Sequence, residues 1–384
     1  MARKICVVTG SRADYGLLRY VMKEIQKDGN LKLQVLATGT HNSELFGNTY
    51  QELLADGFVI DEKIVNIGGE DSAIGVSTEI AHGLLESAKA LEFLNPDLIV
   101  VLGDRFEIFA TVTAALISRI PIAHIHGGEL TTGAFDDALR HSITKMSQVH
   151  FVATNEYERR VIQLGEAPST VFQVGGLGVD VISQSTLLTK NELEEELGLK
   201  FKKKNLLVTF HPETLGSTSS RAQIQELLSA LSCLDETLLI FTKPNADPGG
   251  LAIDRLIEKF VANNQSAHYF KSMGIINYLS CIAFVDGVVG NSSSGLTEVP
   301  SFKKGTINIG DRQKGRIAAK SVINCAGNQE SILNAFEILY SKQFQNQLSR
   351  TVNPYGNGGA SKQIVDVIKE IPLAGIIKKS FHDL

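Results

Sequence analysis

Cysteine is scarce in this chain of 384 residues, and the four that occur, Cys6, Cys233, Cys281 and Cys325, lie far apart without a CxxC pair. That spacing excludes a zinc finger or a dense disulfide framework, and it is typical of free thiols in a reducing cytosol. Long apolar runs are missing too. No run reaches the ~18 residues of a membrane helix, and the apolar stretch after the first four residues is too short for a secretion signal. We therefore expect a cytoplasmic protein with no membrane partner.

A large excess of charge of one sign is also absent. The 37 Lys and Arg residues against 42 Asp and Glu leave a net charge of -5, so no overall field attracts nucleic acid, and none is expected as a partner. Any anionic ligand must be held by local groups. With 43% hydrophobic residues, the composition is that of a folded protein, and the length favours two domains.

Short β-branched runs alternate with segments of helical period. Residues 15–28 and 106–118 carry apolar side chains at i, i+3, i+4 and i+7, which predicts helices. Nearly continuous apolar strands suit a parallel sheet covered on both faces. The strands expected in the first half are 5–10, 33–39, 97–104, 121–128, 150–155 and 171–176.

The same rhythm restarts after a charged connector at 189–205. We predict an α/β protein with two doubly wound parallel-sheet domains, 1–182 and 183–360, an interdomain cleft, and a C-terminal helix within 361–384 that packs back on the first domain. The strands expected in the second half are 205–212, 237–244, 266–271, 283–295 and 305–311.

Ligands of doubly wound sheets bind beyond the carboxyl ends of the strands, so the polar residues found there are the site candidates. In the first half these are Ser11, Arg12, Asp14, His41, Asp104, Arg105, His124, His126, Glu129 and Asn155. In the second half they are His211, Lys243, Asn291, Ser292, Ser293, Ser294 and Glu298.

The segment NSSSGLTEVP, 291–300, follows an apolar strand and is predicted to open a short helix. Its serines and Gly295 offer hydroxyl and backbone N–H groups suited to phosphate. HPET, 211–214, repeats the arrangement, with Pro212 suited to a first helical position. Ordinary helix capping explains each segment equally well in isolation. Because the chain has no Walker motif and no GxGxxG after a strand, a diphosphate here favours a sugar nucleotide over ATP or NAD.

The segment HIHGGE, 124–129, supports three interpretations. In a strand, His124 and His126 would share one face, as in an HxH metal pair. His124 alone is more often a satisfied core histidine. His126 and Glu129, beside glycines that admit a ligand, are candidates for acid/base work.

Two further segments carry charged residues. GDRFE, 103–107, places Asp104 and Arg105 just past a strand, and a helix-capping ion pair is the plainer explanation there. DDALRHSITK, 136–145, puts Asp136 and Arg140 one helical turn apart, with His141 next to them, where a surface salt bridge would suffice.

Taken together, these motifs resemble the hydrolysing UDP-N-acetylglucosamine 2-epimerases of sialic acid biosynthesis. The resemblance runs in order from residue 3 to about 320, and GSRAD with HPETL is similar to the hydrolysing branch. It implies two Rossmann-like domains in the glycosyltransferase-B arrangement, conversion of UDP-GlcNAc and water to UDP and N-acetylmannosamine without metal or cofactor, and a homodimer or homotetramer. The motifs are GSRADYG, GDRFE, HIHGGE, DDALRHSITKMS, HPET, GNSSSGLTEVPS and INIGDRQKGR.

The resemblance also implies roles for individual residues. Departing UDP would be stabilised by Arg12, His211, Ser293 and Ser294, with Asn291, Ser292 and Gly295 in the same loop, Glu298 on the ribose, and Arg312, Gln313 and Arg316 near the uridine and phosphate. The acid/base groups would be Asp104, His126 and Asp136, with Glu129 in reserve. His126 stands where some members of the wider family carry a glutamate. His41 and Arg140 would bind the sugar, and Ser11, Asp14 and Arg105 complete the substrate site.

Four alternatives remain open at this stage. A sugar transferase would share the fold and the nucleotide half of the site. A metal hydrolase would lose activity with a chelator, and a binding module would turn nothing over. Within the family, the substrate could instead be UDP-2,4-diacetamido-2,4,6-trideoxyglucose.

Overall fold

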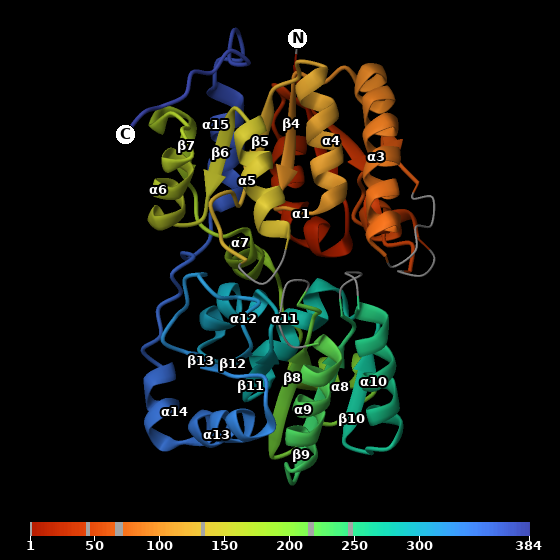
Figure 1. The fold of residues 1–384 in the computed structure, drawn as a ribbon, viewed down its shortest axis with the longest axis vertical. Helices are drawn as coiled ribbons and strands as arrows, with labels where there is room; N and C mark the ends of the chain where they lie inside the picture. Colours follow the sequence, from red (N-terminus) through yellow and green to blue (C-terminus); the bar gives the residue numbers. More distant parts are fainter. Residues whose placement is uncertain (1, 44–46, 66–71, 132–134, 214–218, 245–248) are drawn as a thin grey trace. The chain divides into compact units, whose positions relative to one another are not determined.

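The computed structural model describes residues 2–43, 47–65, 72–131, 135–213, 219–244 and 249–384. The chain divides into two compact units (Figure 1). The first contains residues 1–129, 136–181 and 358–384, and the second contains residues 130–135 and 182–357. No helix among the described residues is long and apolar enough to cross a membrane.

The first unit is built on a seven-stranded sheet in the order β3-β2-β1-β4-β5-β6-β7, and every recorded pairing is parallel. Its strands are β1 (Arg3–Thr9), β2 (Leu31–Ala37), β3 (Glu62–Lys63), β4 (Leu98–Leu102), β5 (Ile122–Ile125), β6 (Val149–Val152) and β7 (Val171–Gln173). Its helices are α1 (Arg12–Lys27), α2 (Tyr50–Ala55), α3 (Ala73–Leu94), α4 (Phe106–Ile117), α5 (Asp136–Met146), α6 (Asn155–Gln163), α15 (Ala360–Glu370), and α7 (Leu177–Gln184), which continues into the second unit.

Both faces of this sheet are covered, as its apolar strands require. Ile5 and Val7 pack in one core with side chains of α1 and α15, whereas Cys6 and Val8 pack in another with side chains of α3, α4 and α5. Alternate residues of one strand therefore serve two different cores.

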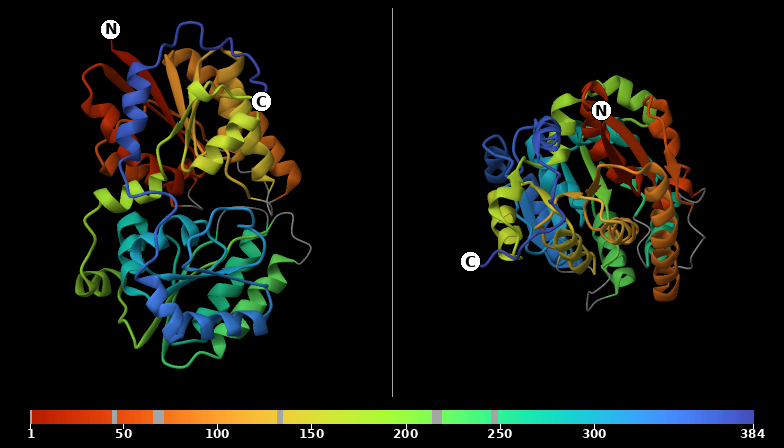
Figure 2. Two further views of the ribbon diagram at one scale, coloured as in Figure 1. Left: turned by 90° about the vertical axis from the view of Figure 1, so that its left-hand side faces the viewer. Right: turned by 90° about the horizontal axis from the view of Figure 1, so that it is seen from above.

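Helix α15 lies against α1 (Figure 2). Its first turn is fixed by Asp180, a fully buried carboxylate that accepts hydrogen bonds from the backbone N–H groups of Gly359 and Ser361. A carboxylate at a helix N-terminus satisfies otherwise unpaired N–H donors.

The second unit repeats the design with a six-stranded sheet in the order β10-β9-β8-β11-β12-β13, again parallel throughout its recorded pairs. Its strands are β8 (Lys204–Thr209), β9 (Thr237–Thr242), β10 (Ala267–Phe270), β11 (Gly287–Gly290), β12 (Gly305–Ile309) and β13 (Val322–Cys325). Its helices are α8 (Lys190–Leu197), α9 (Ser220–Ser232), α10 (Gly250–Ala262), α11 (Gly274–Phe284), α12 (Ser294–Thr297), α13 (Gln329–Tyr340) and α14 (Lys342–Leu348).

Candidate active site

In the first unit, an ion pair joins the loop after β4 to helix α5. The Arg140 guanidinium is 2% exposed and contacts the Asp104 carboxylate. It also donates to the backbone carbonyl of Glu129 at 3.0 Å and lies 3.4 Å from a carboxylate oxygen of Asp137. The helical spacing had suggested a surface salt bridge between Arg140 and Asp136. Arg140 is instead buried, and its ion-pair partners are Asp104 and Asp137. Arg140 therefore holds together three segments that carry acid/base candidates.

His126 has a backbone φ of +66°, in the left-handed region that β-carbon-bearing residues rarely adopt. Its ring Nε2 accepts the backbone N–H of Leu177 at 3.3 Å, so a neutral ring carries its proton on Nδ1. Nδ1 lies 3.5 Å from the Glu129 carboxylate. His126 and Glu129 thus lie within ion-pair distance of each other, on the side of the ring that carries the proton.

The left-handed turn overturns the expected HxH geometry. Strand β5 ends at Ile125, so His124 and His126 do not share a strand face. His124 is fully buried, with its ring nitrogens 2.7 Å from the Gly103 carbonyl and 3.1 Å from the Thr144 hydroxyl, as expected of a core histidine. Burial lowers the pKa of His124 to about 3. Within the described ranges, no group of three or more His, Cys, Asp or Glu residues could hold a metal ion.

The glycines after His126 are required by packing within the protein. A β-carbon on Gly128 would lie 2.5 Å from the Tyr157 carbonyl oxygen, and one on Gly127 would lie 3.0 Å from the Thr144 hydroxyl. Their missing side chains let the loop pack against α5 and α6.

Glu107, a side chain that the sequence suggested only as a helix cap, lies at the carboxyl edge of the same sheet. It is 5% exposed and accepts from Arg105 Nε at 2.6 Å. A β-carbon on Gly10 would lie 2.7 Å from its Cγ, so the glycine of GSRAD makes room for this carboxylate. Burial raises the pKa of Asp14 to about 6. The Arg105 charge opposes this rise, and the Glu107 charge adds to it.

Three other first-unit candidates have structural contacts. Ser11 is the N-cap of α1 and accepts the N–H of Asp14 at 3.3 Å. His41 is fully buried between the Thr9 and Thr49 hydroxyls, each 2.9 Å from a ring nitrogen, and burial lowers the pKa of His41 to about 4. Its ring ties β1 to the following segment and stays neutral. Burial also lowers the pKa of Arg12, which begins α1.

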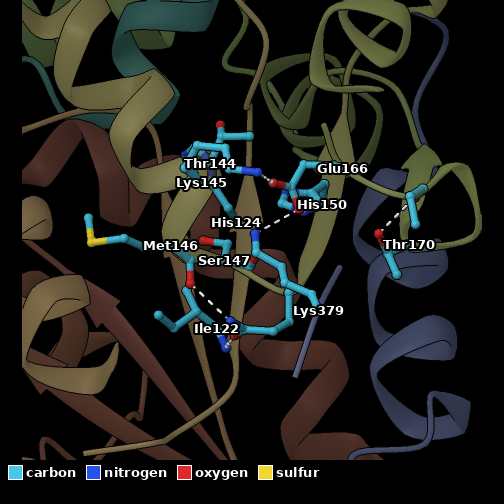
Figure 3. A network of polar contacts seen from close by, with 12 residues as sticks. Ile122, His124, Thr144, Lys145, Met146, Ser147, His150, Glu166, Thr170 and Lys379 are labelled. Atoms are coloured by element: carbon cyan, nitrogen blue, oxygen red, sulfur yellow. Dashed lines mark hydrogen bonds and ion pairs between the residues drawn. The ribbon is translucent and has the colours of Figure 1, made fainter. Parts of the chain in front are cut away.

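A second buried network lies behind β5 and β6, in neighbouring register with His124 (Figure 3). Glu166, 1% exposed, lies 3.0 Å from the His150 ring and accepts from Lys145 at 2.6 Å and Lys379 at 2.7 Å. Lys379 also donates to the Ser147 carbonyl at 2.6 Å. This network joins the C-terminal segment to α5 and to the amino end of β6, whereas the site candidates follow the carboxyl ends of the strands.

In the second unit, Asn291 clamps two strand ends together. Its side-chain oxygen accepts the N–H of His211 at 2.7 Å, and its side-chain nitrogen donates to the His211 carbonyl at 2.8 Å. Asn291 is fully buried and His211 is 7% exposed. The amide therefore fixes the positions of the residues after β8 and β11.

The segment after β12 supports the same clamp. Arg312 and Gln313 donate to the Asn291 carbonyl at 3.2 and 2.8 Å. Glu213 accepts the N–H groups of Asp311 and Arg312 at 3.1 and 3.2 Å, so its carboxylate holds the turn. The family resemblance implied that Arg312 and Gln313 lie near the uridine and phosphate. In the structure, both side chains donate to the backbone carbonyl of Asn291.

Arg316 contacts a segment far away in the sequence. Its Nε donates to the Leu130 carbonyl at 2.9 Å, and a terminal nitrogen lies 3.3 Å from the Thr131 hydroxyl. These contacts tie residues 130 and 131 to the second unit.

The expected helix starts differ from those observed. Residues 211–213 are not helical, and α9 is capped by Ser219, so Pro212 does not occupy a first helical position; Thr214 lies outside the described residues. Helix α12 has only four residues, and the Ser293 side chain makes no cap hydrogen bond. Helix capping therefore does not account for the run of serines at 292–294.

The remaining residues of this loop differ in their surroundings. A β-carbon on Gly295 would lie 2.6 Å from Thr306 Cγ2, so Gly295 permits packing on β12. Glu298 accepts from the Thr297 hydroxyl at 2.5 Å. Lys243 lies 3.5 Å from Asp254 and is thus used within the unit.

Sequence reasoning assigned no role to Tyr278 or Glu213, although both contact the candidate loops. Glu213 belongs to the HPET motif, so the motif could have identified it as a candidate. Tyr278 stands in an apolar helical segment with no motif, and only the fold brings its hydroxyl to Ser294.

Comparison with known proteins gives a coherent result. The family model described as UDP-N-acetylglucosamine 2-epimerase matches residues 23–369. The chain is 41% identical over 384 residues to a GDP/UDP-N,N'-diacetylbacillosamine 2-epimerase (hydrolyzing) of Campylobacter jejuni, covering 100% of this chain and 99% of the relative. It is 39% identical over 388 residues to polysialic acid biosynthesis protein P7 of Escherichia coli, covering 100% and 98%. For a UDP-N,N'-diacetylbacillosamine 2-epimerase (hydrolyzing) of Legionella pneumophila, the identity is 34% over 374 residues and the coverage 97% of each chain.

Solved structures share the fold. The UDP-GlcNAc 2-epimerase of Neisseria meningitidis bound to UDP-GlcNAc superposes with a TM-score of 0.80 at 19% identity, covering 95% of this chain and 99% of that one. The Methanocaldococcus jannaschii enzyme in complex with UDP-GlcNAc and UDP gives 0.75 at 17%, with the same coverage. The predicted fold class, two parallel-sheet α/β domains of glycosyltransferase-B type, is confirmed. Since the family model spans most of the chain and the relatives match it from end to end, the chain belongs to the UDP-N-acetylglucosamine 2-epimerase family of enzymes.

Proposed function

We propose that the chain is a hydrolysing 2-epimerase of a UDP-2-acetamido sugar. The observation that carries this proposal is the buried Arg140, which ties Asp104 to the segment bearing His126 and Glu129. Titratable groups gathered at one sheet edge are what proton transfer at a sugar carbon requires. Full-length identity with two relatives named as hydrolysing 2-epimerases supports the reaction class.

The second unit would bind the nucleotide. Serine hydroxyls 292–294 and His211 lie at neighbouring strand ends, joined by the Asn291 clamp. We assign the diphosphate to these groups, with Glu298 on the ribose and Arg312, Gln313 and Arg316 shaping the loop. Donors held in place before the reaction stabilise the charge that develops on departing UDP.

The reaction would proceed by elimination and hydration. As the C1–O bond breaks and its electron pair leaves with UDP, a base removes the C2 proton, which leaves 2-acetamidoglucal. Water then adds its hydroxyl to C1 while an acid delivers a proton to the opposite face of C2, giving the epimerised free sugar. No oxidant or reductant enters this balance.

Asp104 and the His126–Glu129 pair are our candidates for these two proton transfers, with Asp136 at the start of α5 as a third. A carboxylate paired with a guanidinium can accept a proton, and a histidine with its proton on Nδ1 beside a carboxylate can exchange one. Their different surroundings suit them to different steps. In this proposal, Arg140 is a positioning residue rather than a direct ligand of the sugar.

UDP-N-acetylglucosamine is the first candidate substrate, and its product would be N-acetylmannosamine, a precursor for sialic acid. The 39% identity with a polysialic acid biosynthesis protein supports it. The diacetamido-trideoxy substrate is the second candidate, because two relatives are named for diacetylbacillosamine. Both fit the same chemistry at C1 and C2.

The test is a proton NMR time course of each UDP-sugar with purified protein in D2O containing EDTA. We expect UDP and a free 2-epimerised sugar deuterated at C2 from one of the two substrates. Turnover without deuterium at C2 would contradict the elimination mechanism, and absence of turnover with both sugars would contradict the function. Sugar transfer to an added alcohol without release of free sugar would favour a transferase.

We also propose that the protein acts in the cytoplasm as a homo-oligomer. Helices α3 and α4, which pack together, expose Ile74, Leu85, Phe93 and Ile117 at 80%, 56%, 76% and 77%. Large apolar side chains exposed on two packed helices are typical of a protein interface.

A further inference from the structure

The hydroxyl of Tyr278 connects helix α11 to the serine loop after β11. It donates a hydrogen bond to Ser294 Oγ at 2.8 Å. Burial raises the pKa of Tyr278 above its ordinary value, so this phenol keeps its proton at physiological pH. Tyr278 is therefore a permanent donor to Ser294.

The bond to Tyr278 restricts the Ser294 hydroxyl. A hydroxyl carries a single proton, and its oxygen can accept a hydrogen bond while that proton is donated elsewhere. Because the Ser294 oxygen accepts from Tyr278, the Ser294 proton is directed away from Tyr278.

We propose that Tyr278 is a positioning residue of the diphosphate site: by donating to Ser294 it fixes that hydroxyl as a donor toward the leaving phosphate. This inference rests on the proposed function. Without Tyr278 the Ser294 hydroxyl could rotate to act as donor or acceptor. With Tyr278 the donor is aimed before substrate arrives, which is the condition under which such a group stabilises developing charge.

The test compares Tyr278→Phe with the wild type for UDP affinity by calorimetry and for kcat and KM on whichever UDP-sugar the protein turns over. We expect UDP binding to weaken roughly fivefold and kcat/KM to fall roughly tenfold, mostly in kcat, because the bond to the anion strengthens as charge develops. In a Ser294→Ala background, the Tyr278→Phe change should have almost no further effect.

Tyr269→Phe is the matched control. Tyr269 donates its hydroxyl to Asp254 in the same unit, away from the serine loop, so its loss should affect thermal stability but leave UDP affinity and kcat unchanged. Ser294→Ala alone should lose at least as much UDP affinity and kcat as Tyr278→Phe. Unchanged UDP affinity and kcat in Ser294→Ala would overturn the inference if Tyr278→Phe fails to fold.

Unchanged kinetics in Tyr278→Phe, or losses that add fully to those of Ser294→Ala, would overturn the inference while leaving the proposed function intact. If the wild type neither binds UDP nor turns over a UDP-sugar, the proposed function fails and the inference fails with it.

Discussion

At the scale of single residues, the contrast between Asp104 and Asp137 gives a sharp test of the acid/base assignment. Both carboxylates contact the buried Arg140 guanidinium. We expect Asp104→Asn to lower kcat by roughly 10²- to 10⁴-fold, the usual contribution of a proton-transfer group, and to leave UDP affinity unchanged. Asp137→Asn, the matched control, should keep most of the activity. Equal losses in both variants would mean that the carboxylates serve only to hold Arg140.

Asp14 should make stability depend on pH. Its folded pKa of about 6 lies above the ordinary 3.8, so the folded state binds the proton more tightly than the unfolded state. The corresponding stabilisation is fully present below pH 3.8, decreases as the pH rises, and is lost above about pH 6; it amounts to about 3 kcal/mol. Urea unfolding from pH 4 to 8 should show that Asp14→Asn gains stability relative to the wild type over this window. A constant difference between the two proteins would contradict the assignment.

The sequence indicated which residues gather at the strand ends but not how they pair. Asp104, His126 and Arg140 were identified from motifs, because strand termini in a parallel sheet share one edge. The burial of Arg140 and the left-handed turn at His126 were not predictable, since both depend on contacts with distant segments. His41 and Gly128 resembled ligand-binding residues, yet their neighbours are Thr49 and Tyr157 of the protein itself.

At the scale of elements, the Glu166 carboxylate connects β6, α5 and the C-terminal segment, because it contacts a side chain from each of them (Figure 3). Burial raises the pKa of Glu166, but hydrogen bonds from His150, Lys145 and Lys379 outweigh burial and lower it to about 2. The stabilisation is therefore present above pH 4.5 and is lost as the pH falls toward 2. Glu166→Gln should cost about 3 kcal/mol in urea unfolding at pH 7, because the ion pairs of this buried carboxylate with Lys145 and Lys379 are lost.

The exposed Lys362–Asp366 pair on α15 supplies the control for Glu166. Asp366→Asn should change the free energy of unfolding by less than about 0.5 kcal/mol, as is usual for surface ion pairs. A comparably small effect in Glu166→Gln would contradict a structural role for the buried network.

The apolar strands could be predicted from the sequence. Both faces of a parallel sheet are covered, so its strands stand out as nearly continuous apolar runs. The expected strands at 97–104 and 237–244 contain β4 and β9, and the C-terminal helix expected within 361–384 corresponds to α15. The two-residue β3 was missed because so short a strand carries no apolar pattern. Strand β13 was missed because Asn324 and Cys325 at its end are only partly buried or exposed, as at a sheet edge.

At the scale of the whole molecule, the fold class and family followed from the order of motifs, whereas the place of residues 130–131 in the second unit did not. Arg316 joins these two residues to the second unit. The contact leaves no periodic signal, because it links residues more than 170 positions apart.

The oligomeric state is the whole-molecule property that surface chemistry predicts. Helices α3 and α4 both lead into parallel strands, so Phe93 and Ile117, at their C-terminal ends, lie at the same edge of the first unit. Light scattering after size-exclusion chromatography should give a dimer or tetramer for the wild type, and Phe93→Glu combined with Ile117→Glu should reduce its mass, because charges in an apolar interface are unfavourable. Val352→Glu, at a residue 76% exposed in the second unit, should leave the mass unchanged. A wild-type monomer at micromolar concentration, or dissociation caused by Val352→Glu alone, would place the interface elsewhere or remove it.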